Sequence, residues 1–155
     1  MELADILAVP AVLFCTDITA KHQLFETLAA HAAALTGRTQ TEILEAVAGR
    51  EALGSTGLGN GIAIPHGKLG GLGGVTALFA RLEHPIDFDA VDDHPVDLVV
   101  MLLAPTGAGA DHLKALSRVA RLLRTESVVE ALRQTDDPVR LHAILTTPLV
   151  ATDAA

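Results

Sequence analysis

The sequence lacks the features that mark secreted and membrane proteins. Its one cysteine, Cys15, can support no disulfide framework, and no nearby basic cluster makes that thiol reactive. The longest apolar run, residues 95–105, is too short to span a bilayer as a helix. The opening segment, MELADILAVP, has neither the basic region nor the long apolar stretch of a signal peptide. We therefore expect a cytoplasmic protein with no membrane insertion.

Aromatic residues and positive charge are also scarce. Aromatics make up 3% of the chain, with no tryptophan or tyrosine, so the core must be aliphatic. At 155 residues, half of them hydrophobic, the chain is long enough for one well-covered core and too short for two ordinary domains. The net charge of −8, with a basic cluster only at Arg118, Arg121 and Arg124, argues against nucleic-acid binding. We predict one domain, residues 1–146, and a tail, residues 147–155.

The most informative segment that is present is a glycine-rich loop that ends in a histidine. Gly54, Gly57, Gly59 and Gly61 can take positive φ and leave backbone N–H groups free to approach an anion. The apolar residues 62–64 then predict a short buried strand. Pro65 fixes φ and removes a donor, so we expect it to hold the His66 imidazole at the strand end and outside the hydrogen-bond ladder.

This setting suits a phosphoryl acceptor. A neutral imidazole has one ring nitrogen with a free lone pair, which can attack phosphorus. Arg50 could supply a planar fork for phosphoryl oxygens. Further donors could come from the loop, as a phosphoryl-binding set made of Ser55, Thr56, Gly57 and Gly59.

The residues alone leave a structural alternative open at each position. The loop could be only a turn with a hydrogen-bonded histidine, and Arg50 only a cation at a helix end. Ser55 and Thr56 could be turn-forming residues.

Other motifs that such a loop can imitate do not fit. The spacing from Gly61 to Lys68 is one residue too long for a Walker A loop, and Leu69 stands where a magnesium-binding hydroxyl should be. The run from Gly54 to Gly57 lacks the spacing of a hydrolase nucleophile elbow, and the glycines do not complete a dinucleotide-binding pattern. The remaining histidines show no metal-binding spacing. We therefore expect no cofactor and no metal.

Helices and strands are predicted to alternate. Thr19 is a candidate cap for a helix that ends at Gly37, and Thr39 with Glu42 predicts a capping box for a helix that ends near Arg50 and turns Leu44, Val47 and Ala48 inward. Further helices are predicted at 110–123, 127–134 and 138–145, and strands at 12–15, 62–64, 75–82 and 96–104.

This pattern predicts an α/β sandwich, a mixed sheet with helices on both faces, without fixing the strand order. His112 falls in the first turn of the helix at 110–123, where the helix dipole favours a bound phosphate and lowers the histidine's pKa.

The segment REALGSTGLGNGIAIPHGK, residues 50–68, resembles the signature of phosphotransferase-system enzyme IIA domains of the mannitol/fructose type (type 2), especially their nitrogen-regulatory relatives. The similarity continues through RLEHPIDFDAVDDHPVDLVVMLLAP, residues 81–105, and GADHLKALSRVARLLR, residues 109–124. It implies the mannitol-type IIA fold for the domain at residues 1–146.

Position by position, the resemblance assigns three residues. His66 matches the family's phosphorylated histidine, which carries the phosphoryl group on Nε2. Arg50 matches its active-site arginine and His112 its second active-site histidine. Lys68 has only a weak claim as an additional cation.

The resemblance also implies a function. It implies a regulatory phosphohistidine carrier, whose donor is an HPr-like histidine phosphocarrier protein and whose targets are proteins such as transporters or sensor kinases. Two alternatives stay open. The chain could be a sugar-specific IIA component, for fructose or mannitol, that passes phosphate to a separate IIB protein, or it could be a non-catalytic regulatory binding module.

Overall fold

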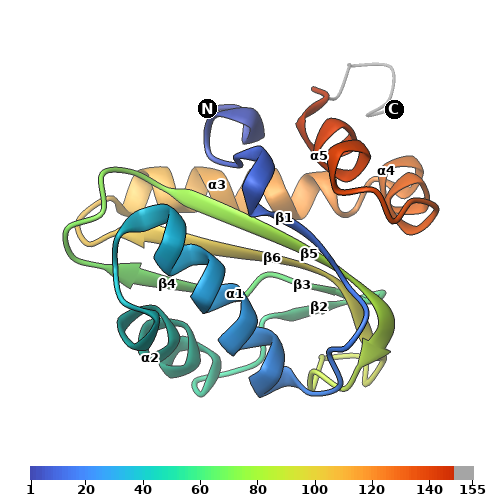
Figure 1. Ribbon diagram of the computed structural model, residues 1–155, viewed down its shortest axis with the longest axis horizontal. Coiled ribbons are helices and arrows are strands. Elements are labelled where there is room, and N and C mark those ends of the chain that lie inside the picture. The colour runs from blue at the N-terminus through green and yellow to red at the C-terminus, as the bar shows by residue number, and fades with distance from the viewer. Residues whose placement is uncertain (149–155) are drawn as a thin grey trace.

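A six-stranded mixed sheet forms the centre of the computed structural model, which describes residues 1–148 (Figure 1). The strands are β1 (Val12–Cys15), β2 (Gly57–Gly59), β3 (Ile62–Ala63), β4 (His66–Leu69), β5 (Thr76–Ile86) and β6 (Val96–Pro105). The helices are α1 (Lys21–Thr36), α2 (Gln40–Glu51), α3 (Gly109–Leu122), α4 (Glu126–Arg133) and α5 (Pro138–Thr146). Two short 3-10 helices, Leu3–Asp5 and Val9–Ala11, precede β1.

Strand β6 organises the sheet. It pairs antiparallel with β5 along one edge, and β1 extends the sheet in parallel beyond β5. Along its other edge β6 pairs in parallel first with β3 and then with β4, while β2 pairs antiparallel with β3. Because β3 and β4 follow one another along the same edge, residues 64–65 connect them and His66 begins the second of the two.

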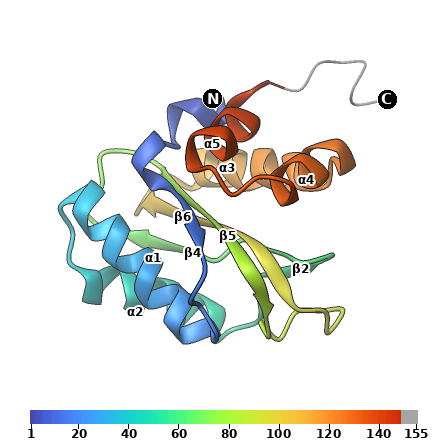
Figure 2. The ribbon, with the colours of Figure 1, turned by 45° about the vertical axis from the view of Figure 1, so that its right-hand side comes forward.

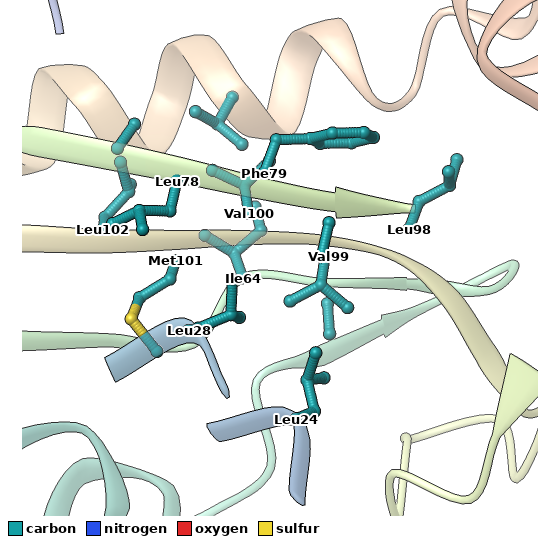
Figure 3. Close-up of a cluster of buried hydrophobic side chains, with 14 of the residues drawn as sticks. Leu24, Leu28, Ile64, Leu78, Phe79, Leu98, Val99, Val100, Met101 and Leu102 are labelled. Carbon is teal, nitrogen blue, oxygen red and sulfur yellow. The ribbon is translucent and has the colours of Figure 1, made fainter. Parts of the chain in front are cut away.

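Helices cover the sheet on both sides, as Figure 2 shows, with α1 and α2 on one face and α3, α4 and α5 on the other. The sequence predicts this α/β sandwich, and the structure confirms it. The run of β6 from Leu98 to Ala104 is buried along its whole length, as expected of a strand packed on both faces. In Figure 3, Val99 and Met101 lie on the α1 side, near Leu24 and Leu28.

Most predicted elements are present, with two local differences in the helices. Thr19 does not cap α1, because the N-cap of this helix is Ala20. The backbone N–H of Thr19 instead donates to the Gln23 side chain at 2.9 Å. Thr39 does cap α2 by accepting the Glu42 N–H at 3.1 Å. The buried face of α2 is carried by Ile43 together with Val47, whereas Ala48, predicted to point inward, is exposed.

The remaining differences concern strands and the chain end. Strands β2 and β4 were not expected from the sequence pattern, and the thiol of Cys15 at the end of β1 is partly buried. Among residues 1–148, no helix is both long and apolar enough to cross a membrane. The boundary at 146/147 stays a prediction, since most of the proposed tail lies outside the described residues.

Candidate functional site

His66 is fixed by the sheet. It is the first residue of β4 and lies opposite Leu102 of β6 in a parallel register. The Leu102 N–H donates to the Pro65 carbonyl at 3.0 Å, so the proline joins the ladder as an acceptor although it cannot donate. The prediction that His66 lies at a strand end is therefore confirmed, whereas the prediction that it stays outside the ladder is wrong. The ladder anchors the histidine backbone more firmly than a free strand end would.

The His66 ring makes one hydrogen bond that determines its tautomer. Its Nδ1 lies 2.9 Å from the Ile64 carbonyl oxygen. A carbonyl oxygen can only accept, so Nδ1 carries the proton and donates it. The neutral ring therefore keeps its lone pair on Nε2, the nitrogen on the far side of the ring. Nε2 is thus the ring nitrogen that is available to a ligand or an electrophile.

The ring of His112, on helix α3, packs against the ring of His66. His112 lies in the first turn of α3, is 6% exposed, and meets the His66 ring edge to face at a centroid distance of 5.3 Å. Burial, with the neighbouring His66 and Lys68 adding to it, lowers the His112 pKa below its usual value. Its Nε2 is buried and has no hydrogen-bond partner among residues 1–148. His112 thus brings a neutral imidazole, with one buried and unsatisfied ring nitrogen, to the wall of the site.

Arg50 reaches the site from the last turn of α2. Its Nη1 donates to the Gly54 carbonyl at 2.9 Å, which leaves other guanidinium N–H groups for a ligand. Gly67 lets α2 lie directly on β4, because a Cβ at this position would come within 3.0 Å of the Ala46 carbonyl carbon. No local pattern in the sequence singles out Gly67, because Ala46, its packing partner, lies twenty-one residues upstream.

These residues line one cavity of about 560 Å³. Arg50, His66, His112 and Lys68 contribute its polar groups, so the three principal residues predicted from the sequence do meet. The rest of the wall is apolar or glycine: Ala46, Gly49, Leu53, Gly67, Gly109, Leu113 and Leu116. Leu53 and Leu113 are 85% and 65% exposed, so the cavity opens beside a pair of apolar side chains.

The glycine-rich loop does not face this cavity. Ser55 Oγ donates to the Phe88 carbonyl at 3.2 Å and accepts the Gly57 N–H at 3.1 Å. Thr56 uses both its N–H and its hydroxyl to bind the Glu51 carboxylate. Gly59 pairs with Ile62 of β3. The geometry therefore does not support phosphoryl binding by Ser55, Thr56, Gly57 and Gly59, because their polar groups are used within the fold or lie away from His66.

The fold itself explains why glycine stands at several positions of this loop. Gly59 and Gly61 do take positive φ, 99° and 83°. Gly57 does not, but a Cβ there would lie 2.7 Å from the Ala90 Cβ, so the position requires a residue without a side chain.

Within residues 1–148, no group of three or more His, Cys, Asp or Glu side chains is arranged to hold a metal ion.

Comparison with known proteins agrees with this architecture. Residues 5–147 match the family profile described as "Phosphoenolpyruvate-dependent sugar phosphotransferase system, EIIA 2". A nitrogen regulatory protein of Bradyrhizobium diazoefficiens is 48% identical over 148 residues, which cover 96% of this chain and 97% of that protein.

Solved structures give the same result. The nitrogen regulatory protein IIA-Ntr from Neisseria meningitidis is similar with a TM-score of 0.86 and 34% identity, covering 93% of this chain and 99% of that one. The IIA mannitol protein of Escherichia coli is similar with a TM-score of 0.74 at 20% identity, covering 89% of this chain and 97% of that one, and so supports the fold alone.

Proposed function

The chain belongs to the EIIA 2 family of the phosphoenolpyruvate-dependent sugar phosphotransferase system, and we propose that it is a cytoplasmic phosphohistidine carrier that accepts a phosphoryl group on His66 Nε2. We propose an HPr-like histidine phosphocarrier as the donor. The observation that carries the proposal is the 2.9 Å contact from His66 Nδ1 to the Ile64 carbonyl, because it leaves Nε2 as the nucleophile.

The proposed step is a displacement at phosphorus. The Nε2 lone pair forms a new P–N bond while the P–N bond to the donor's imidazole breaks, and the electron pair of that bond stays on the donor nitrogen. The Nδ1 proton remains on His66. The ring becomes positively charged as Nε2 is phosphorylated, and the Ile64 carbonyl oxygen stabilises that charge through the existing hydrogen bond.

The cavity supplies the charge that such a step needs. In a loose transition state the negative charge is spread over the three equatorial phosphoryl oxygens. Arg50 can bind two of them through its fork, and the exposed ammonium of Lys68 adds a second cation. His112 lines the same cavity, and its lowered pKa favours a neutral ring, which can donate one hydrogen bond to a third oxygen.

Relatives favour a regulatory role over sugar transport. The proteins from Bradyrhizobium diazoefficiens and Neisseria meningitidis are both described as nitrogen regulatory proteins. Phosphorylation would add close to two negative charges beside the exposed Leu53 and Leu113, so a partner resting on these side chains would sense the phosphorylation state. Target proteins such as transporters or sensor kinases would thereby be held by one form and released by the other.

The proposal is tested by intact mass after incubation with phosphoenolpyruvate, enzyme I and an HPr-like phosphocarrier. We expect one acid-labile phosphoryl group on the wild type and on His84→Ala, which replaces an exposed histidine on β5, and none on His66→Ala. A wild type that gains no mass from a donor shown to be phosphorylated would contradict the carrier function and leave a binding module.

A second arm separates regulation from transport. Addition of a fructose- or mannitol-specific IIB protein to the phosphorylated chain should leave the phosphoryl group on His66 until it is lost by hydrolysis. Rapid transfer to IIB would identify the chain as a sugar-specific IIA component.

A further inference from the structure

Glu51 follows Arg50 in the sequence, and its carboxylate is enclosed in the protein. Its side chain is 7% exposed, yet it carries three hydrogen-bonding partners. It accepts the Thr56 N–H at 2.9 Å and the Thr56 hydroxyl in a very short contact, and its Oε2 lies 2.9 Å from Lys21 Nζ. Glu51 does not line the cavity that holds His66. No step of phosphoryl transfer as described above uses it.

Lys21 is held as firmly as its partner. Its ammonium donates to the Phe88 carbonyl at 3.1 Å and lies 4.3 Å from the centroid of the Phe88 ring. The group therefore has a fixed position at the start of α1. The pKa of Glu51 lies below its usual value. Burial alone would raise this pKa, but the hydrogen bonds from Thr56 and the charge of Lys21 lower it by more. The carboxylate is thus ionised in the fold.

The contact with Thr56 closes the turn that follows α2. The Leu53 N–H donates to the Arg50 carbonyl and the Gly54 N–H to the Glu51 carbonyl, each at 3.1 Å. The side chain of Glu51 then binds Thr56, two residues further along, and fixes the far end of the same turn. Between these two anchors lies the Gly54 carbonyl, which accepts from Arg50 Nη1 at 2.9 Å.

We infer that Glu51, held by Lys21 and closed onto Thr56, is a positioning residue that orients the Arg50 guanidinium toward His66 by fixing the Gly54 carbonyl. This inference rests on the proposed phosphoryl transfer. It also gives Thr56 a role, since the hydroxyl that the loop pattern suggested for phosphate binding serves to hold the turn. A guanidinium that loses one anchor samples several rotamers, and a small misplacement of a charge-stabilising group lowers a transfer rate strongly.

The test is Thr56→Val, which removes the hydroxyl donor and keeps the side-chain shape and the backbone N–H. We expect the rate constant of His66 phosphorylation at saturating donor to fall about tenfold, and Thr56→Ser to restore it. Thr39→Val is the matched control, because it removes a hydroxyl from the other end of α2, where Thr39 caps the helix. It should lower thermal stability and leave the rate constant unchanged.

A double-mutant cycle distinguishes positioning from general loss of stability. If Thr56 acts through Arg50, then Thr56→Val should have no further effect on the rate in an Arg50→Ala background. The inference is overturned if Thr56→Val matches the wild-type rate, or if it costs the same tenfold in both backgrounds.

Failure of the proposed function would look different, because the wild type itself would then gain no phosphoryl group. The Arg50 Nε–H resonance in a nitrogen-15 spectrum still decides the inference in that case. We expect the resonance to shift in Thr56→Val and to stay in place in Thr56→Ser and Thr39→Val. An unshifted resonance in Thr56→Val would overturn the inference.

Discussion

Replacement of Gly67 by alanine should damage both the fold and the site, because this glycine sets how closely α2 lies on β4. A Cβ at Gly67 would lie 3.0 Å from the Ala46 carbonyl carbon and 3.1 Å from the Val47 nitrogen, whereas ordinary contacts are 3.4–4 Å. Both neighbours are backbone atoms, so the helix as a whole must move by a few tenths of an ångström. Overpacking of this kind costs about 1–3 kcal/mol.

The displacement should reach the chemistry because Arg50 lies one helical turn beyond Ala46, on the same side of α2. At roughly 2–4 °C per kcal/mol for a chain of this length, the melting temperature of Gly67→Ala should fall by about 2–12 °C. Moving Arg50 away from His66 should lower the phosphorylation rate constant about tenfold. The control is Gly74→Ala, because a Cβ there meets nothing within 4 Å.

Circular dichroism melting and quenched intact-mass kinetics measure the two effects of Gly67→Ala. A Gly67→Ala protein as stable as the Gly74→Ala control would refute the packing argument. A destabilised protein with a normal rate would refute the link between the spacing of α2 and β4 and the position of Arg50.

Two further predictions concern stability. Because the His112 pKa lies below the ordinary value of about 6.5, the unfolded state binds this proton more readily, and the fold loses stability as pH falls from about 6.5 toward the lowered pKa. His112→Asn should therefore lose less melting temperature between pH 7.5 and pH 5.5 than the exposed-site control His84→Asn, and equal losses would contradict the assignment. The free energy of unfolding should rise by about 0.5–1 kcal/mol in Gly49→Ala, because alanine favours the helix more than glycine does. A Cβ at this position in α2 meets nothing within 4 Å. The melting temperature of this variant should rise by about 1–4 °C in calorimetry, and a lower value would show unrecognised crowding.

Local signals in the sequence predict much of this fold. Thr39 caps α2, and Gly37 ends α1 with φ 74°, because both act through neighbouring backbone groups. The apolar run of β6 marks a strand covered on both faces. The meeting of Arg50, His66 and His112 follows from the family resemblance rather than from periodicity, which places each residue at the end of an element but not beside the others.

The features that escaped prediction depend on distant partners. Strand β4 carries a histidine, a glycine and a lysine, and only its pairing with β6 makes it a strand. The hydroxyl of Ser55 is used by Phe88, thirty-three residues away. Hydrogen-bond donors in a glycine-rich loop therefore look available for a ligand in the sequence, although in the folded protein they bind distant residues. The contact of Glu51 with Lys21 likewise joins residues far apart in the sequence and could not be predicted from a local pattern.

The central claim is that His66 accepts the phosphoryl group on Nε2 because Nδ1 is bound to the Ile64 carbonyl. Phosphorus–nitrogen correlation in the NMR spectrum of the phosphorylated, nitrogen-15-labelled protein tests it directly. The account predicts a single phosphohistidine at His66 with phosphorus bonded to Nε2 and the proton retained on Nδ1. Phosphorus on Nδ1, or on any residue other than His66, would contradict it.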